Sequence, residues 1–306
     1  MGDQPIARLS SRGLAHGVAA YCLWGLFPLY WKMLAHVPAL QVLAHRIVWS
    51  CVILVVLVEW RRRRGTPLPS LPPRVVGAYG VAAVLIGVNW FLYVWGVSAG
   101  LVLQTSLGYF INPLVSVVFG VIVFRERLRP LQWVAVGVAA LGMAYLALSV
   151  DGIPWVSLGL AVSFASYGVV KKYASLSALE GLTLETVILW VPAAVFLCLV
   201  GWRGTGVFLQ DARVTDFLLV AGGLVTIVPL LLFASSLRLV PLSTVGILQY
   251  IAPSIQFLLG VLVYHEPFGR AELVGFSAVW LALVGFTIDG LWATRAHRFR
   301  PSHSTR

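Results

Sequence analysis

The sequence is poor in charge and above all in acids. Only 11% of its 306 residues are charged, whereas a soluble domain carries about 25%. Eleven residues are Asp or Glu, against 22 that are Lys or Arg. With so few carboxylates, no nucleophile elbow and no phosphate-binding glycine loop, the sequence predicts a protein that is not an enzyme.

Cysteine and histidine are scarce as well. The three cysteines, Cys22, Cys51 and Cys198, lie within apolar runs and lack the spacing of a paired set. This argues against a disulfide framework and predicts packing roles for them. The six histidines show no HExxH or similar ligand spacing. We therefore expect no metal site and no cofactor.

Apolar residues are abundant, at 59% of the chain, and they form runs of about 20 residues, long enough to cross a bilayer as helices. Helices are the only open-chain structure that satisfies its own backbone in lipid. The predicted fold class is an all-α polytopic membrane protein with ten transmembrane helices. Their approximate ranges are 13–34, 39–60, 75–97, 102–124, 130–149, 153–172, 182–201, 215–237, 243–264 and 271–292.

The net charge of +11 is concentrated beside these runs, notably in RRRR at 61–64 and in the tail from Arg295 to Arg306. This distribution indicates contact with the lipid bilayer rather than with nucleic acid. With the N-terminus inside, seventeen Lys and Arg residues fall on the inner side and three in the outer loops. The positive-inside rule therefore predicts that both termini are cytoplasmic. The first run is too long for a signal peptide and is read as a span.

The chain repeats itself at an offset near 140. LGYFINPLVSVVFGVIVFRERL (107–128) aligns with LQYIAPSIQFLLGVLVYHEPF (248–268), and YCLWGLFPLYWK (21–32) matches SFASYGVVKKYA (163–174) more weakly. Five spans separate the two copies, so they should cross the membrane in opposite directions. We expect a first five-helix repeat at 1–150, a second, inverted one at 151–292 and a basic cytoplasmic tail at 293–306. Inverted repeats of this kind are typical of alternating-access carriers.

The stretch LGYFINP (107–113) places polar residues and a proline inside an apolar run, and LQYIAP (248–253) does the same in the other copy. Each proline frees a carbonyl four residues back, and such backbone is tolerated at depth only where protein or a cavity covers it. Both turns should converge near the midplane as walls of a substrate chamber, although kinks packed by neighbouring helices are the alternative. The residues concerned are Tyr109, Asn112, Gln249 and Tyr250 as substrate-binding residues and Pro113 and Pro253 as hinges.

These stretches, together with AHRIVWS (44–50), NWFLYVW (89–95), FASYGVVKK (164–172), LETVILWVP (184–192) and VTIVPLLLF (225–233), give the chain a resemblance to a known family. It resembles the RarD proteins, a bacterial group in the EamA branch of the drug/metabolite transporter superfamily. The resemblance covers nearly the whole chain. It implies ten helices in two inverted five-helix repeats, an inner-membrane location and transport of small metabolites or drugs. RarD proteins are linked by name to chloramphenicol sensitivity.

Two of the charges inside predicted spans are candidate functional residues. Arg46 lies about 10 Å from the outer face, where burying a charge costs much free energy. One interpretation is that its guanidinium binds an anionic substrate. The other is a structural role, in which it bonds backbone carbonyls or snorkels toward the membrane surface. Glu185 is either a proton-coupling carboxylate or the partner of Lys171 or Lys172. Asn89 and Tyr93 share a helix face suited to a flat ligand. Further candidates, each weighed against simple packing, are Trp24, Tyr167 and Thr226.

The leading functional prediction is a secondary transporter for a small-molecule substrate. A passive channel lined by the same groups is the second hypothesis, and a membrane-embedded enzyme or sensor is the third. The sequence does not specify the substrate, the direction of transport, the energy coupling or the oligomeric state.

Overall fold

The computed structural model describes residues 10–99, 101–147, 154–210, 212–264 and 269, and parts of the segment 273–285. All regular secondary structure in these ranges is α-helix, which confirms the predicted all-α class. Most of the tenth predicted span, the basic tail and Glu266 lie outside the described residues. The helices are α1 (Ser11–Gly25), α2 (Phe27–Lys32), α3 (Ala39–Arg63), α4 (Pro73–Ser98), α5 (Val102–Phe124), α6 (Pro130–Ala147), α7 (Trp155–Tyr173), α8 (Ala178–Trp202), α9 (Arg213–Leu239), α10 (Leu242–Leu248) and α11 (Ile251–Leu262).

Six segments among the described residues are long and apolar enough to cross a membrane. They are Ala39–Arg63, Pro73–Gly96, Leu107–Phe124, Ala178–Trp202, Arg213–Leu239 and Leu242–Leu262. The other four predicted spans correspond to α1 with α2, to α6, to α7 and to helical pieces between 273 and 285, which are shorter or less apolar.

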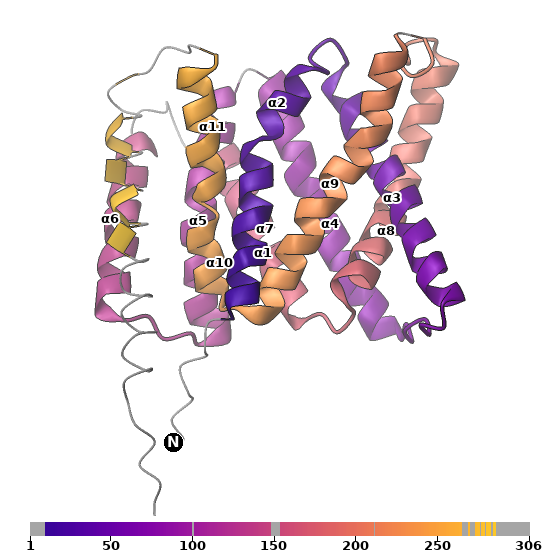
Figure 1. Cartoon of the computed structure of the whole chain (residues 1–306). Helices are drawn as coiled ribbons and strands as arrows, with labels where there is room; N and C mark the ends of the chain where they lie inside the picture. Colours follow the sequence, from indigo (N-terminus) through magenta and orange to yellow (C-terminus); the bar gives the residue numbers. More distant parts are fainter. Residues whose placement is uncertain are drawn as a thin grey trace, which may run out of the picture.

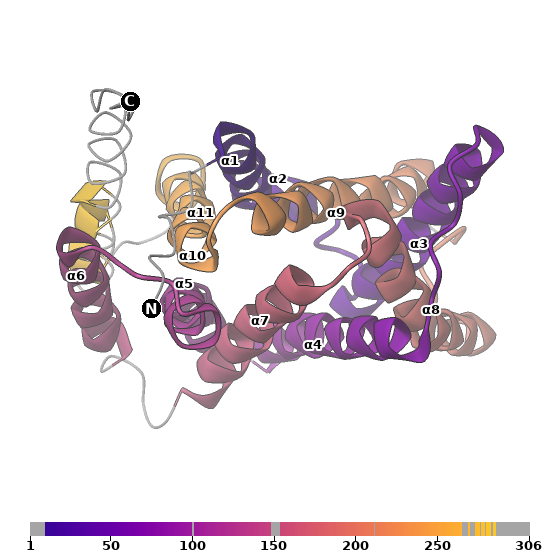
Figure 2. The same ribbon diagram turned by 90° about the horizontal axis from the view of Figure 1, so that it is seen from below.

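Successive long helices alternate in direction along the chain (Figure 1). We call the end that carries the loops 64–72, 125–129 and 174–177 the lower end, and the end that carries the loops 33–38 and 203–210 the upper end. Seen from below, α6 stands at one edge of the molecule and α3 and α8 at the other (Figure 2). Between these edges α1 packs on α9, and α7 packs on both α4 and α5.

Two of the predicted spans are broken helices. The first span divides at Leu26, where Pro28 in the first turn of α2 starts a new helix. The ninth divides at Gln249 and Tyr250, four and three residues before Pro253. The carbonyl of Gln249, which Pro253 leaves unpaired, instead accepts the Ala252 N–H at 3.3 Å. In contrast, α5 continues through Pro113, so only one of the two proline turns interrupts its helix.

Glycines allow two close helix contacts near the centre of the molecule. A Cβ built on Gly223 of α9 would lie 2.7 Å from the Trp49 carbonyl carbon of α3. A Cβ on Gly246 of α10 would lie 2.9 Å from the Pro113 carbonyl oxygen of α5. Small residues at such crossings are how transmembrane helices approach closely. Gly246 lies two residues before the second repeated stretch, so its contact brings that stretch close to the first one.

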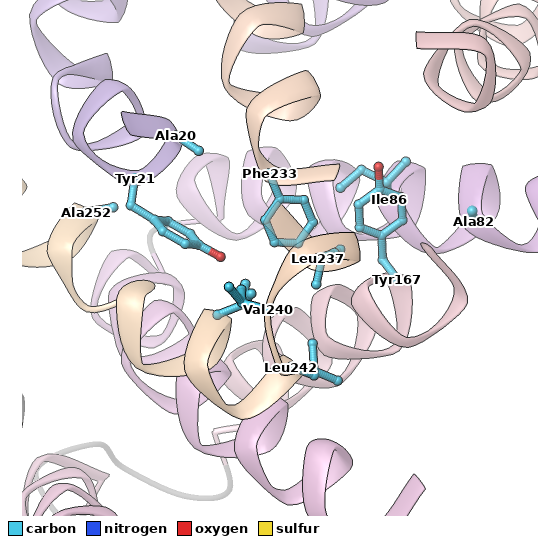
Figure 3. Close-up of a cluster of buried hydrophobic side chains, with 11 residues drawn as sticks. Ala20, Tyr21, Ala82, Ile86, Tyr167, Phe233, Leu237, Val240, Leu242 and Ala252 are labelled. Atoms are coloured by element: carbon cyan, nitrogen blue, oxygen red, sulfur yellow. The ribbon is translucent and has the colours of Figure 1, made fainter. Parts of the chain in front are cut away.

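A buried hydrophobic cluster, here called the lower cluster, fills the space between α1, α4, α7, α9, α10 and α11 (Figure 3). Its members include Phe233 and Leu237 near the lower end of α9, Tyr167 of α7 and Val245 of α10, each at most 1% exposed. Aromatic rings pack against each other within it. For example, the ring of Tyr167 stacks on that of Phe233, with ring centroids 6.2 Å apart. Buried side chains therefore fill the space between these six helices.

Below this cluster, Glu126 joins the ends of several helices. Its carboxylate accepts the backbone N–H groups of Leu242 at 2.7 Å and Ser243 at 2.8 Å, at the start of α10. Lys172 at the end of α7 lies 3.4 Å from the same carboxylate and donates to the Val240 carbonyl at 2.9 Å. We call these contacts the Glu126 network. A carboxylate at a helix N-terminus is stabilising because it satisfies amides that have no helical partner.

A second ion pair lies deeper. Lys171 of α7 and Glu185 of α8 are 2.6 Å apart, and their side chains are 3% and 1% exposed. The Tyr167 hydroxyl donates to the other carboxylate oxygen of Glu185 at 3.0 Å. Glu185 therefore pairs with Lys171, as one of its two interpretations from the sequence predicted.

Candidate substrate cavity

A cavity of about 250 Å³ lies on the upper side of the lower cluster. Residues of α1, α2, α3, α4, α5, α7, α9 and α11, and Gln249 at the break before α11, line it, so both halves of the sequence contribute. The cavity and the lower cluster share Tyr21 and Ala252, which places the packed cluster directly beneath the cavity.

Most of the residues predicted to bind substrate meet at this cavity. They are Trp24, Arg46, Asn89, Tyr93, Tyr109, Asn112, Thr226 and Gln249, and Pro253 joins them. Asn112 and Gln249, one from each repeated stretch, are 6% and 5% exposed. Residues about 140 positions apart in the chain thus line one small space.

Arg46 is held firmly at the cavity wall. Its Nε donates to the Thr226 hydroxyl at 3.0 Å, and its guanidinium lies 4.7 Å from the Trp31 ring centroid and 5.1 Å from that of Trp90. It bonds no backbone carbonyl of the described residues. The guanidinium of Arg46 therefore neither bonds backbone carbonyls nor snorkels to the membrane surface.

Aromatic and amide side chains form the facing wall. The rings of Tyr93 and Tyr109 meet edge to face with centroids 5.6 Å apart. Asn89 donates to the Leu160 carbonyl at 2.9 Å and to the Ser163 hydroxyl at 3.0 Å, which fixes α4 against α7. Asn89 and Tyr93 share a face of α4, as their spacing predicts, and both line the cavity.

Two predicted binding residues do not line the cavity. Tyr167 points into the lower cluster and bonds Glu185. Tyr250 is 0% exposed and packs between α5 and α6 with Leu107 and Phe110. The helix break turns Tyr250 away from its neighbour Gln249, while Tyr167 lies about one turn deeper than the cavity-lining Phe164. Pro113 also lies outside the lining, and Glu185 is engaged by Lys171.

Several lining residues escaped the sequence reasoning. They are Tyr21, Phe27, Pro28, Trp31, Trp90, Val94, Phe164, Leu230, Ala252 and Gln256. Phe27 and Trp31 belong to α2, and the proline at position 28 was the available signal that the first span breaks there. Gln256 follows Pro253 by about one turn on α11 and donates to the Trp24 carbonyl at 3.1 Å. A polar residue so placed on an apolar helix was a second signal.

Comparison with known proteins identifies the family. The EamA-like transporter family matches residues 11–148 and again residues 152–288. The RarD protein of Streptomyces exfoliatus is 45% identical over 94% of this chain and 92% of its own length. The RarD protein of Escherichia coli strain K12 is 40% identical over 94% and 98%. The chain belongs to the EamA-like transporter family and, within it, to the RarD proteins.

A solved crystal structure shares the fold. It is only 20% identical, but it superposes with a TM-score of 0.67 over 92% of this chain and 99% of its own. The family and the apolar helices together make this protein a multi-pass membrane transporter, and not an enzyme.

Proposed function

We propose that the protein is a secondary transporter that moves a small metabolite or drug-like solute across the bacterial inner membrane by alternating access around the cavity. The observation that carries the proposal is the joint lining of one cavity by both repeated stretches, through Asn112 and Gln249. Carriers of inverted-repeat design place their site where the two halves meet.

The proposed mechanism goes with a proposed architecture of ten helices in two inverted five-helix repeats, at 1–150 and 151–292. The two matches to one family, over 11–148 and 152–288, are consistent with a duplicated unit. The aligned helices α5 and α11 run in opposite directions (Figure 1). Rocking of one unit against the other would move the closed region from one side of the cavity to the other.

The packed region below the cavity favours a carrier over a passive channel. A channel needs a continuous wet path, whereas the lower cluster and the Glu126 network fill the lower half with buried side chains. A carrier closed on one side presents this arrangement in one of its two states. Opening the lower side would require these contacts to separate.

The lower end is proposed to face the cytoplasm. It carries Arg61 to Arg64, Arg125, Arg127, Arg129 and Arg238, whereas Arg203 and Arg213 are the basic residues of the upper loop between α8 and α9. This asymmetry follows the positive-inside rule and places the start of α1 on the cytoplasmic side. The proposed partners are the solute and the lipid bilayer.

Transport in liposomes tests the proposal. A metabolite screen of cells with and without the protein selects the solute, and the panel includes chloramphenicol, to which the name of one relative refers. Reconstituted protein should then show counterflow, in which external solute accelerates the exit of internal solute. Tyr109→Ala and Gln249→Ala should weaken it, while Tyr145→Ala and Gln210→Ala, at exposed positions outside the cavity, should not. Normal transport by both cavity variants would contradict the assignment, and flux without counterflow would indicate a pore.

A further inference from the structure

The cavity has an unbalanced charge. Arg46 is the one charged residue among the described residues that line it, and no Asp or Glu of that lining opposes it. Three buried or half-buried acids elsewhere in the bundle have partners of their own: Lys171 for Glu185, α10 and Lys172 for Glu126, and the Leu209 N–H for Asp216. A cation without a counter-ion in a region of low dielectric favours an anionic ligand.

The hydrogen bonds of Arg46 leave its fork directed at the cavity. Thr226 donates its own hydroxyl proton to the Gly222 carbonyl at 2.7 Å, so its oxygen accepts the Arg46 Nε–H. The two terminal nitrogens of Arg46 have no acceptor among the described residues, and neither is sealed away from solvent-accessible space. The four N–H groups on these nitrogens are therefore available to a ligand, in the geometry that matches a carboxylate.

Two buried acceptors also lack donors. The Oδ1 atom of Asn112 has no hydrogen-bond partner in the described structure, although its side chain is more than nine-tenths buried and lines the cavity. The Oε1 atom of Gln249 is unpaired too, but the side chain of Gln249 lies within hydrogen-bonding reach of the Tyr21 hydroxyl, a donor that also lacks a partner. Leaving a buried carbonyl unpaired costs free energy because its hydration is lost without replacement. A ligand that donates an N–H or O–H to the Asn112 oxygen removes this cost.

The rest of the wall suits a flat apolar body. Trp24 and Phe164 meet edge to face at 6.0 Å, and Tyr93 and Tyr109 do the same at 5.6 Å. Trp31 and Trp90 flank the guanidinium of Arg46. Aromatic walls of this kind bind planar groups through burial and ring contacts.

We propose that Arg46 makes the cavity selective for a small carboxylate monoanion that has a flat apolar body and a hydrogen-bond donor. The carboxylate engages the fork of Arg46, and the donor faces Asn112. A dianion such as a phosphate monoester is disfavoured because one arginine leaves its second charge uncompensated. This inference rests on the proposed function only in taking the cavity as the substrate site.

Binding of five aromatic probes tests the charge preference directly. The full chain in lipid nanodiscs is titrated calorimetrically with 4-hydroxyphenylacetate, its neutral amide 4-hydroxyphenylacetamide, the cation tyramine and the dianion phenyl phosphate. The carboxylate should bind about tenfold more tightly than the amide, as expected for a charge-assisted pair, and tyramine and phenyl phosphate should bind more weakly still. Phenylacetate, which lacks the hydroxyl donor, should bind more weakly than 4-hydroxyphenylacetate but more tightly than phenyl phosphate, which lacks the same donor and carries the second charge.

Three substitutions locate the preference at the fork. Arg46→Gln should bring the ratio of carboxylate to amide affinity close to one, and Arg46→Lys should retain part of it, since lysine keeps the charge but not the planar fork. Thr226→Val should reduce the ratio through loss of the Nε anchor. Thermal unfolding of each variant in nanodiscs shows whether it is folded. The order of the probe affinities for the unsubstituted protein tests the inference even if a variant does not fold.

The outcomes separate this inference from the proposed function. Equal affinity for the charge series, tighter binding of tyramine or of the phosphate, or no binding of any probe at millimolar concentration overturns the inference. Counterflow of some other solute would then still support the transporter. Conversely, tight binding of the carboxylate with no movement across liposomes supports the inference and counts against transport.

Discussion

The side-chain amide of Gln249 donates a hydrogen bond to the Ser116 hydroxyl across 3.1 Å. This buried bond joins α5 to the break between α10 and α11, and so links the two stretches that the sequence aligns as a repeat. It lies beside the close contact of Gly246 with Pro113. The crossing of the two repeated stretches is thus held by a polar bond and by backbone contact together.

Removing either partner of this bond should destabilise the protein. Ser116→Ala leaves the Gln249 amide buried without its acceptor, and we expect a loss of about 1–3 kcal/mol in the free energy of unfolding. Gln249→Leu should cost a similar amount, and the double variant should cost less than the sum of the two. Chemical unfolding in nanodiscs measures the three values. Strict additivity would show that the bond contributes nothing to stability.

Substitutions in the buried pair of Lys171 and Glu185 distinguish a structural role of Glu185 from a role in proton coupling. Glu185→Gln alone leaves an uncompensated buried lysine and should destabilise the protein by about 3–5 kcal/mol, the typical cost of breaking a buried ion pair. If the pair is structural, Lys171→Met together with Glu185→Gln should recover both stability and transport. If Glu185 carries the coupling proton, the double variant should be folded but should no longer respond to a pH gradient. Uptake by liposomes with and without an imposed gradient makes the distinction.

The extent of sequence-based prediction differs between the fold and the cavity. Helices and their approximate ranges follow from apolar runs, because lipid leaves the backbone no other solution. Arg46 was identifiable because a charge in such a run needs a partner or a cavity, and Asn112 and Gln249 were identifiable because the repeat places both at one depth. Each of these residues was identifiable because a polar or charged side chain is unusual within an apolar run.

The direction of a side chain next to a helix break could not be predicted from the sequence in the same way. Gln249 and Tyr250 are adjacent, but the first faces the cavity and the second packs against Leu107 and Phe110. The dihedral angles of the break decide between them, and periodicity does not specify those angles. Trp31 was missed for the same reason, since it faces the cavity only because the first span restarts at Phe27.

Neighbouring glycines on α9 should respond differently to alanine. In Gly223→Ala the new Cβ would lie 2.7 Å from the Trp49 carbonyl carbon and 2.8 Å from the Ser50 nitrogen, and backbone atoms cannot move aside cheaply. We expect a loss of about 1–3 kcal/mol in the free energy of unfolding, as for other overpacked sites. In Gly222→Ala the nearest atoms, at 3.7 Å, are Arg46 Cγ and the Tyr30 hydroxyl, an ordinary contact. That variant should be neutral or slightly stabilised because alanine favours helix. Equal effects of the two changes would contradict the close crossing of α3 and α9.

The Glu126 network should control access to the cavity from the lower end. The two carboxylate oxygens of Glu126 each accept one backbone N–H of α10, so Glu126→Gln would place an NH₂ group against one of those donors and remove the attraction of Lys172. Loss of charge-assisted bonds worth about 1.5–3 kcal/mol should raise the population opened at the lower end by roughly tenfold or more.

Cysteine labelling measures this population. Cys22, Cys51 and Cys198 are replaced, and a single cysteine is introduced for the cavity-lining Asn112. A membrane-impermeant maleimide applied at the lower face should label it faster when Glu126→Gln is also present. Glu59→Gln is the matched control, because Glu59 is exposed and its partners Arg62 and Arg63 belong to the same helix. Since the control breaks a comparable ion pair without releasing a second helix, an equal rise in labelling for both variants would show that the network does not hold the lower end closed.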